Sequence, residues 1–282
     1  MKRAQWITIG GAILLTILLY TTTKDRLFGE RKVKTTPPVA HVSHEGLSTD
    51  SVLYYSKRNL TKEQVERLNQ LENGISRGDV AAQKLTSYHQ LAHFWADSAK
   101  LFAPYAFYTG EAARLENSEK SLTFAAHLFL DNLTNEEDPR LKQWEAFQAK
   151  DLFERSLKLN PSNDSSKVGL GATYLFGGIE MPMQGIQMIR DVVQKDPTNV
   201  YAQMTLGRAS VLSGQMDKAV ERFQTVIKMQ PANAEAVLLL ADTYDRMNNK
   251  PAAIEWYEKS LPLIPNPEYK SEVTKRINEL KK

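Results

Sequence analysis

The chain has 282 residues, no cysteine and a formal net charge of +3. The absence of cysteine excludes disulfides, thiolate catalysis and cysteine-ligated metals. The positive charge is concentrated at the N-terminal end, because residues 1–34 carry seven Lys or Arg and two acidic residues, whereas the remainder carries 29 basic and 31 acidic residues. The main body therefore lacks the overall positive field that binds a phosphate backbone, and we expect no nucleic-acid partner.

A segment without charge follows a short flank at residues 1–3. Residues 4–23 are mostly apolar, and Trp6 and Tyr20 lie near the two ends of this range. Twenty helical residues rise about 30 Å, the thickness of the hydrocarbon core of a bilayer, and aromatic rings of this kind favour its interfaces. The segment lacks an Ala-x-Ala cleavage site. We therefore predict an uncleaved transmembrane helix rather than a secretory signal.

The sequence leaves the side of the membrane open. Basic residues are more numerous after the apolar segment than before it, which favours a cytoplasmic main domain, whereas the basic start at Lys2 and Arg3 resembles that of exported chains. We expect a single-pass protein of a bacterial inner membrane, with the main domain on either its periplasmic or its cytoplasmic side.

Residues 24–46 are predicted to be a basic linker. This range contains Pro37 and Pro38, which favour an extended polyproline conformation. Residues 47–84 are predicted to form a helical N-terminal cap. In it, Thr61 and Gln64 have the spacing of a capping box, and apolar residues then follow on one helical face. These residues are Val65, Leu68, Leu71 and Ile75.

A period of 34 residues runs through the last third of the chain, where Pro197-Thr198-Asn199 is repeated as Pro231-Ala232-Asn233 and Pro265 follows. Four further pairs share the offset, namely Leu206 and Leu240, Gly207 and Ala241, Ala219 and Ala253, and Phe223 and Tyr257. A fixed period of this length indicates stacked copies of one helical hairpin. The Asn residues that follow each Pro, Asn163, Asn199 and Asn233, are predicted N-caps of the next helix.

The order of these residues resembles the tetratricopeptide repeat, although Ser210 stands where the family usually has Tyr. The resemblance implies an all-α fold: a right-handed superhelical solenoid of about five helical hairpins over residues 85–267, strongest over residues 164–265. Residues 268–282 would form a capping helix, with Val273, Ile277 and Leu280 on its buried face. We expect an insertion at about residues 132–141 between the two helices of the second hairpin.

The sequence offers no arrangement of residues for catalysis. His89 and His93 lie four residues apart on one side of a helix, but no third metal ligand can be identified. Nucleophile motifs and phosphate-binding loops are also missing from the sequence. We therefore expect a protein without enzymatic activity, metal, cofactor or small-molecule substrate.

In tetratricopeptide repeat proteins the first helix of each repeat lines a concave groove that holds a peptide or a partner helix. The resemblance places nine residues of this chain in such a groove: His89, His93, Tyr201, Met204, Arg208, Glu235, Leu238, Asp242 and Arg246. Some members clamp a C-terminal carboxylate with Lys, Asn and Arg, but the matching positions here hold Met204, Leu238 and Asp242, so this ligand is not expected. The same residues are also compatible with solvated helix faces.

These observations lead to two hypotheses about function. The first is a membrane-tethered, non-catalytic scaffold that binds a partner protein or peptide in its groove. The alternative is a self-assembling structural subunit of an envelope or secretion complex. The sequence identifies neither the partner nor the pathway.

Overall fold

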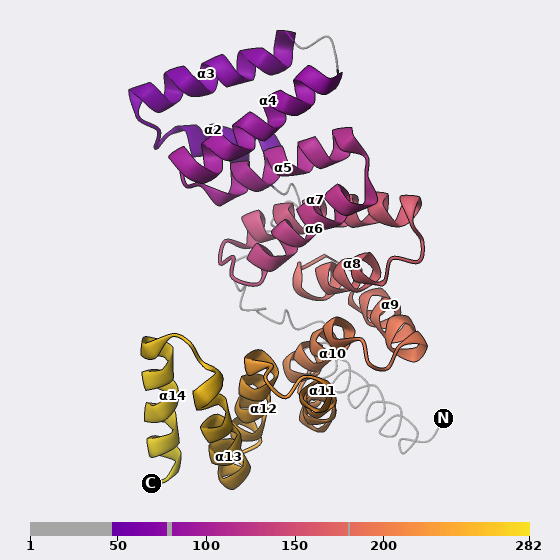
Figure 1. The fold of residues 1–282 in the computed structure, drawn as a ribbon, viewed down its shortest axis with the longest axis vertical. Coiled ribbons are helices and arrows are strands. Elements are labelled where there is room, and N and C mark those ends of the chain that lie inside the picture. Colours follow the sequence, from indigo (N-terminus) through magenta and orange to yellow (C-terminus); the bar gives the residue numbers. More distant parts are fainter. Residues whose placement is uncertain (1–46, 78–80, 180) are drawn as a thin grey trace, which may run out of the picture. The chain divides into compact units, whose positions relative to one another are not determined.

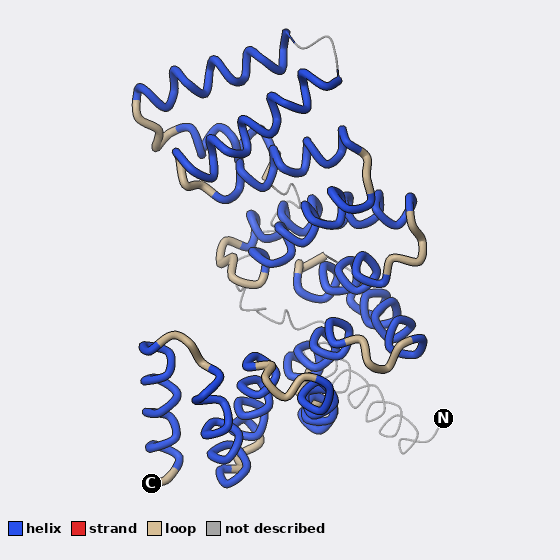
Figure 2. The backbone as a smooth tube through the Cα atoms, in the orientation of Figure 1, coloured by secondary structure: helices blue, strands red, loops and turns tan. Residues whose placement is uncertain are grey.

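The computed structural model describes residues 47–77, 81–179 and 181–282. Within these ranges all regular elements are helices and no strand occurs (Figure 2). The prediction of an all-α fold is therefore confirmed for the described residues. The predicted membrane segment at residues 4–23 and linker at residues 24–46 lie outside them, and none of the helices between residues 47 and 282 that are described combines the length and apolar character of a membrane span.

The described helices follow one another in the order of their labels (Figure 1). They are α2 (Thr49–Lys57), α3 (Lys62–Arg77), α4 (Ala81–His93), the π-helix η1 (Phe94–Ser98), α5 (Phe102–Glu116), α6 (Glu119–Leu133), α7 (Pro139–Leu159), α8 (Asp164–Phe176), α9 (Pro182–Lys195), α10 (Val200–Leu212), α11 (Met216–Met229), α12 (Ala234–Arg246), α13 (Lys250–Ser260), the 3-10 helix η2 (Leu261–Leu263) and α14 (Pro267–Leu280).

Five antiparallel hairpins form the array. The paired helices are α4 with α5, α6 with α7, α8 with α9, α10 with α11 and α12 with α13. Each hairpin also packs on the next, through α7 on α8 and α11 on α12 for example, so every pair covers apolar surface of its neighbour. The predicted number of hairpins is confirmed, while the right-handed superhelix stays a prediction.

The last hairpins begin in the way that the period predicts. Asn163, Asn199 and Asn233 precede α8, α10 and α12, and the side chain of each accepts a hydrogen bond from the backbone N–H three residues later, at 2.9, 2.9 and 3.0 Å. A cap of this kind satisfies one of the free N–H groups of the first turn. The three predicted N-caps are confirmed.

Small residues let the paired helices approach closely. A Cβ atom on Gly207 would lie 2.5 Å from the ring of Phe223, and a Cβ atom on Gly185 would lie 2.5 Å from the carbonyl oxygen of Gly171. The first contact packs α10 on α11 and the second packs α8 on α9. The periodic large residues fill the space between helices and are buried; they are Leu206, Phe223, Leu240 and Tyr257.

The expected insertion at residues 132–141 is wrong. Helix α6 continues to Leu133 and α7 begins at Pro139, so only residues 134–138 connect the two helices. Asp138 caps α7, where its carboxylate accepts a hydrogen bond from the N–H of Arg140 at 2.9 Å. Proline is well suited to the first helical position, because its fixed φ fits the helix and no N–H is needed there. Pro139 therefore begins a helix of 21 residues.

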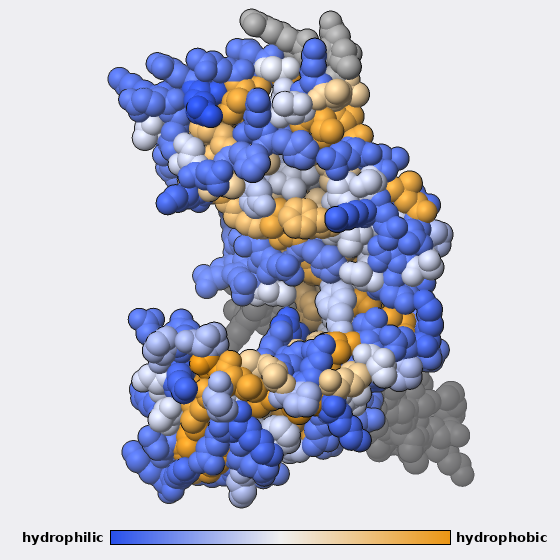
Figure 3. Space-filling model, viewed as in Figure 1, coloured by the Kyte–Doolittle hydropathy of each residue, from blue (hydrophilic) through white to orange (hydrophobic). Residues whose placement is uncertain are grey.

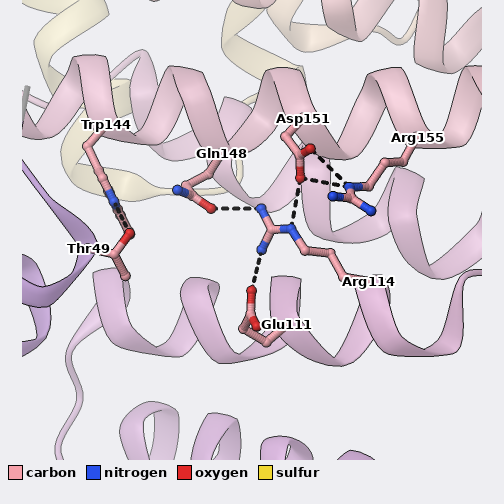
Figure 4. Close-up of polar contacts among 7 residues, drawn as sticks. All are labelled: Thr49, Glu111, Arg114, Trp144, Gln148, Asp151 and Arg155. Carbon is pink, nitrogen blue, oxygen red and sulfur yellow. Dashed lines mark hydrogen bonds and ion pairs between the residues drawn. The ribbon is translucent and has the colours of Figure 1, made fainter.

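Helix α7 also contacts the N-terminal helices α2 and α5 through polar side chains (Figure 4). The indole N–H of Trp144 donates to the Thr49 hydroxyl of α2 at 3.1 Å. The guanidinium of Arg114 in α5 donates to Asp151 and Gln148 of α7, both at 2.8 Å, and to Glu111 of its own helix at 2.9 Å. These contacts join α2 and α5 to α7 through specific polar atoms.

Other parts of the predicted N-terminal cap and C-terminal helix agree with the structure. Thr61 and Gln64 form the reciprocal capping box, with bonds of 2.9 and 3.3 Å between the backbone N–H of one and the side chain of the other. Val273, Ile277 and Leu280 of α14 are buried. The apolar face of α14 therefore covers the end of the stack. The π-helix before α5, which buries Trp95 completely, had no counterpart in the prediction.

Candidate functional site

The first helices of the later hairpins line two adjoining depressions. We name them the α14 depression, of about 580 Å³, and the α6 depression, of about 560 Å³. Both are lined by Thr134, Phe176, Arg208 and Glu235, so they form one continuous groove. On the face drawn in Figure 3, hydrophobic side chains gather along the hollow between α6 and α12.

The floor of the α14 depression is apolar. It consists of Leu175, Phe176, Val211, Leu212, Leu238, Leu239 and Tyr269, which come from α8, α10, α12 and α14. Leu212 is 73% exposed and Tyr269 is 44% exposed. Apolar side chains gathered in this way on a surface with polar edges are typical of protein-binding sites.

Charged side chains also line the α14 depression, around its apolar floor. Arg208 and Glu235 pair across α10 and α12, and the carboxylate of Asp242 accepts a hydrogen bond from the Tyr257 hydroxyl at 2.5 Å. Lys142 and Arg246 line the same depression. Within the described residues, neither cation makes an ion pair with a carboxylate.

Lys142 has an acidic neighbour that does not neutralise it. Glu145 lies one turn further along α7 and is completely buried, and this burial raises the pKa of its carboxyl group to about 8. One carboxyl oxygen accepts a hydrogen bond from Asn132 at 2.8 Å, while the other has no partner among the described residues. At neutral pH Glu145 is therefore mostly protonated and uncharged.

The α6 depression is lined by a half-buried tyrosine, Tyr201, whose hydroxyl is buried. The hydroxyl of Tyr201 has no hydrogen-bond partner among the described residues, and burial raises the pKa of this group above its usual value. The ring of Tyr201 packs against that of His127, with 5.5 Å between centroids, and burial lowers the pKa of His127. Asp131 lines the same depression, and its charge adds to the shift at Tyr201.

The structure brings seven of the nine predicted groove residues together. Those on α10 are Tyr201, Met204 and Arg208, and those on α12 are Glu235, Leu238, Asp242 and Arg246. Met204 is only 7% exposed, so it belongs mainly to the core. That these residues contact a partner stays a prediction.

The two histidines lie in a different place. His89 and His93 line a separate depression of about 470 Å³ between α4, α5 and α6. His89 Nε2 lies 3.2 Å from a carboxylate oxygen of Glu116, and His93 Nδ1 lies 3.5 Å from Asp97. Among the residues that the structure describes, no three His, Asp or Glu side chains come close enough together to hold a metal ion.

Several groove residues were missed by the sequence analysis. Leu212 lies four residues after Arg208, so helical spacing on α10 would have found it. Lys142 and Tyr269 come from α7 and α14, which are not the first helices of a repeat. Their approach to the groove depends on how hairpins stack, and no local pattern shows it.

The fold and the groove define the class of the protein, an all-helical solenoid of stacked hairpins. The tetratricopeptide repeat family model matches residues 210–275, and this part of the chain is therefore similar to that family. The matched segment extends from the end of α10 into α14. A comparison with curated proteins found no match.

Several solved structures are similar to this chain. A crystal structure of MamA is 26% identical, with 52% of this chain and 85% of that chain covered and a TM-score of 0.42. MamA from Desulfovibrio magneticus RS-1 is 22% identical, with 64% and 94% covered and a TM-score of 0.45. YrrB, a tetratricopeptide repeat protein with an unusual peptide-binding site, is 17% identical, with 73% and 97% covered and a TM-score of 0.42. With TM-scores below 0.5, these likenesses do not define the function of this chain.

Proposed function

We propose that the protein is a non-catalytic scaffold that binds a segment of a partner protein in the groove between α6, α8, α10, α12 and α14. The observation that supports this proposal best is the apolar floor of the α14 depression, where Leu212 is 73% exposed although it lies among other apolar residues. Covering such a floor would stabilise a complex by about 25 cal/mol for each Å² of apolar surface removed from water. An exposed apolar floor without a partner would promote aggregation.

Tethering to a membrane is the second part of the proposal. It is supported by the uncharged, apolar sequence of residues 4–23, which has the length of a membrane span. A tether of this kind confines the groove to a thin layer at the membrane surface and so raises the local concentration of a partner that is held there too. A bacterial inner membrane is the proposed location. Alkaline extraction of membranes tests the tether, since an integral protein stays in the pellet and a peripheral one is released.

A site-specific photo-crosslinker tests groove binding in cells. The full-length chain would carry the crosslinking residue at Leu212, or at Met183 in the first turn of α9 as a matched control. The two side chains are 73% and 70% exposed, but only Leu212 lines the groove. We expect a defined protein adduct from position 212 and none from position 183.

The identity of the adduct separates the two hypotheses about function. An adduct with another protein supports the scaffold. A covalent dimer of this chain supports self-assembly instead. Equal adduct yields at both positions would contradict groove binding, because exposure alone would then explain the contact.

A further inference from the structure

The two halves of the groove differ in the sign of their charge. The α14 depression is lined by three cations, Lys142, Arg208 and Arg246, and by two carboxylates, Glu235 and Asp242. The α6 depression has the opposite balance, with Asp131 and Glu235 against Arg208. Arg208 and Glu235 pair with each other and line both depressions, so the shared part of the groove is neutral. The excess charges lie in the parts that the depressions do not share, Lys142 and Arg246 in one and Asp131 in the other.

The excess charges are not neutralised within the described chain. Lys142 and Arg246 lack an ion-pair partner there, and so does Asp131. Glu145, the acidic group nearest to Lys142 along α7, is kept mostly uncharged by its burial. Asp242 lines the same depression as Arg246, and its carboxylate accepts a hydrogen bond from the Tyr257 hydroxyl. A ligand in the groove therefore meets a positive end, an apolar and neutral middle, and a negative end.

We propose that the occupant of the groove is an amphipathic protein segment of mixed charge that binds in one direction. Its acidic end lies beside Lys142 and Arg246, its apolar residues cover Phe176 and Leu212, and its basic end lies beside Asp131. This inference rests on the proposed function, since it names the chemistry of the partner at the same groove. Opposite charges at the two ends would select the direction of binding more than they would increase the affinity.

The predicted linker of the chain itself, residues 24–46, is a poor occupant. It contains five Lys or Arg and few acidic residues, and would bring like charge to Lys142 and Arg246.

Selection from a library of random displayed peptides on the full-length protein tests the inference. Peptides are kept if Leu212→Asp abolishes their binding, which restricts the set to the groove. We expect the peptides kept on the wild-type protein to carry acidic residues at one end and basic residues at the other. The Asp131→Lys variant should enrich peptides that are acidic at both ends, and the Lys142→Glu, Arg246→Glu double variant should enrich peptides that are basic at both ends.

Affinities of the selected peptides give the size of the effect. Each charge reversal should raise the Kd of a mixed-charge peptide about tenfold, as expected for loss of a close charge pair at an interface. Matched reversals outside the groove, Lys275→Glu on α14 and Glu66→Lys on α3, should leave the Kd within about twofold. Both of these side chains are exposed and line neither depression.

Two results would overturn the inference in distinguishable ways. If groove peptides are obtained but their charge is the same for the wild-type protein and both variants, the mixed-charge occupant is refuted and groove binding stands. If no peptide sensitive to Leu212→Asp is obtained from any of the proteins, groove binding of peptides is refuted as well. Circular dichroism of each variant ensures that a loss of binding is not a loss of fold.

Discussion

The hairpins from α8 to α13 and the helices from α2 to α7 are held together by different kinds of contact. In the C-terminal hairpins the contacts repeat, since a small residue on one helix faces a large residue on the next and an Asn caps each first helix. In the N-terminal part, single polar contacts on α7 join α2 and α5, and a π-helix interrupts the path from α4 to α5. A contact that repeats can be predicted from a period in the sequence, whereas a contact that occurs once leaves no such pattern.

This difference explains what the sequence predicted and what it did not. The period and the family resemblance predicted the hairpins, the three Asn caps and the buried face of α14, because each depends on residues close together in the chain or at a fixed offset. The expected insertion failed because Pro139 was interpreted as part of a loop, although proline also begins helices. For the groove, positions on α10 and α12 followed from the resemblance, while Lys142 and Tyr269 are brought there only by tertiary packing.

Loss of a repeated contact should have the largest effect on stability. Phe223→Ala removes a fully buried ring that fills the space beside Gly207, and we expect a loss of about 3–5 kcal/mol in the stability of the hairpins around it. Hydrogen exchange of the α10–α12 amides measures this loss locally, which matters because repeat arrays need not unfold in one step. Phe147→Ala, at a ring that is 48% exposed, is the matched control and should change little. Equal effects of the two substitutions would show that the periodic positions have no special role.

Loss of a single polar contact in the N-terminal part should have the next largest effect. Arg114 is 17% exposed and bonds to Asp151, Gln148 and Glu111. Arg114→Met would leave Gln148 and Glu111 without this charged donor and Asp151 with Arg155 alone, and we expect a loss of about 2–3 kcal/mol in the free energy of unfolding of α5–α7. Arg155 bonds to the same Asp151 but is 45% exposed, so Arg155→Met should cost less than about 1 kcal/mol. A reversed order would contradict the role given to Arg114 in Figure 4.

Two glycines distinguish the regions at the level of backbone packing. A Cβ atom at Gly185 would meet a backbone oxygen of α8 at 2.5 Å, whereas at Gly74 it would meet the hydroxyl of Ser87 at 2.9 Å. A backbone atom cannot move aside without shifting its helix, so Gly185→Ala should destabilise α8 and α9 by about 1–3 kcal/mol in chemical denaturation. Gly74→Ala should be neutral or slightly stabilising, because a Ser side chain can rotate and alanine favours helix by about 1 kcal/mol. If Gly185→Ala were stabilising, the close approach of α8 and α9 would be refuted.

The buried carboxyl group of α7 gives an effect on stability that depends on pH. The folded-state pKa of Glu145 is raised from 4.5 to about 8 by burial, so the folded protein holds a proton that the unfolded chain releases. This contribution to stability is complete below about pH 4.5, falls as the pH rises towards 8, and then levels off. Glu145→Gln should therefore stabilise the protein relative to the wild type at pH 8 and leave its stability unchanged at pH 4. Thermal unfolding at both values measures the difference, and a Gln variant that is less stable at pH 8 would contradict a neutral Glu145.

Hydrogen exchange of the full-length protein with and without its crosslinked partner tests the central claim most directly. If the partner lies in the groove, slower exchange on binding should be confined to α8, α10 and α12 and to the parts of α6, α7 and α14 that line the two depressions. The second helices α9, α11 and α13 should exchange as they do in the free protein. Protection of α11 and α13 with no change in α10 and α12 would show that the partner binds the other side of the hairpins.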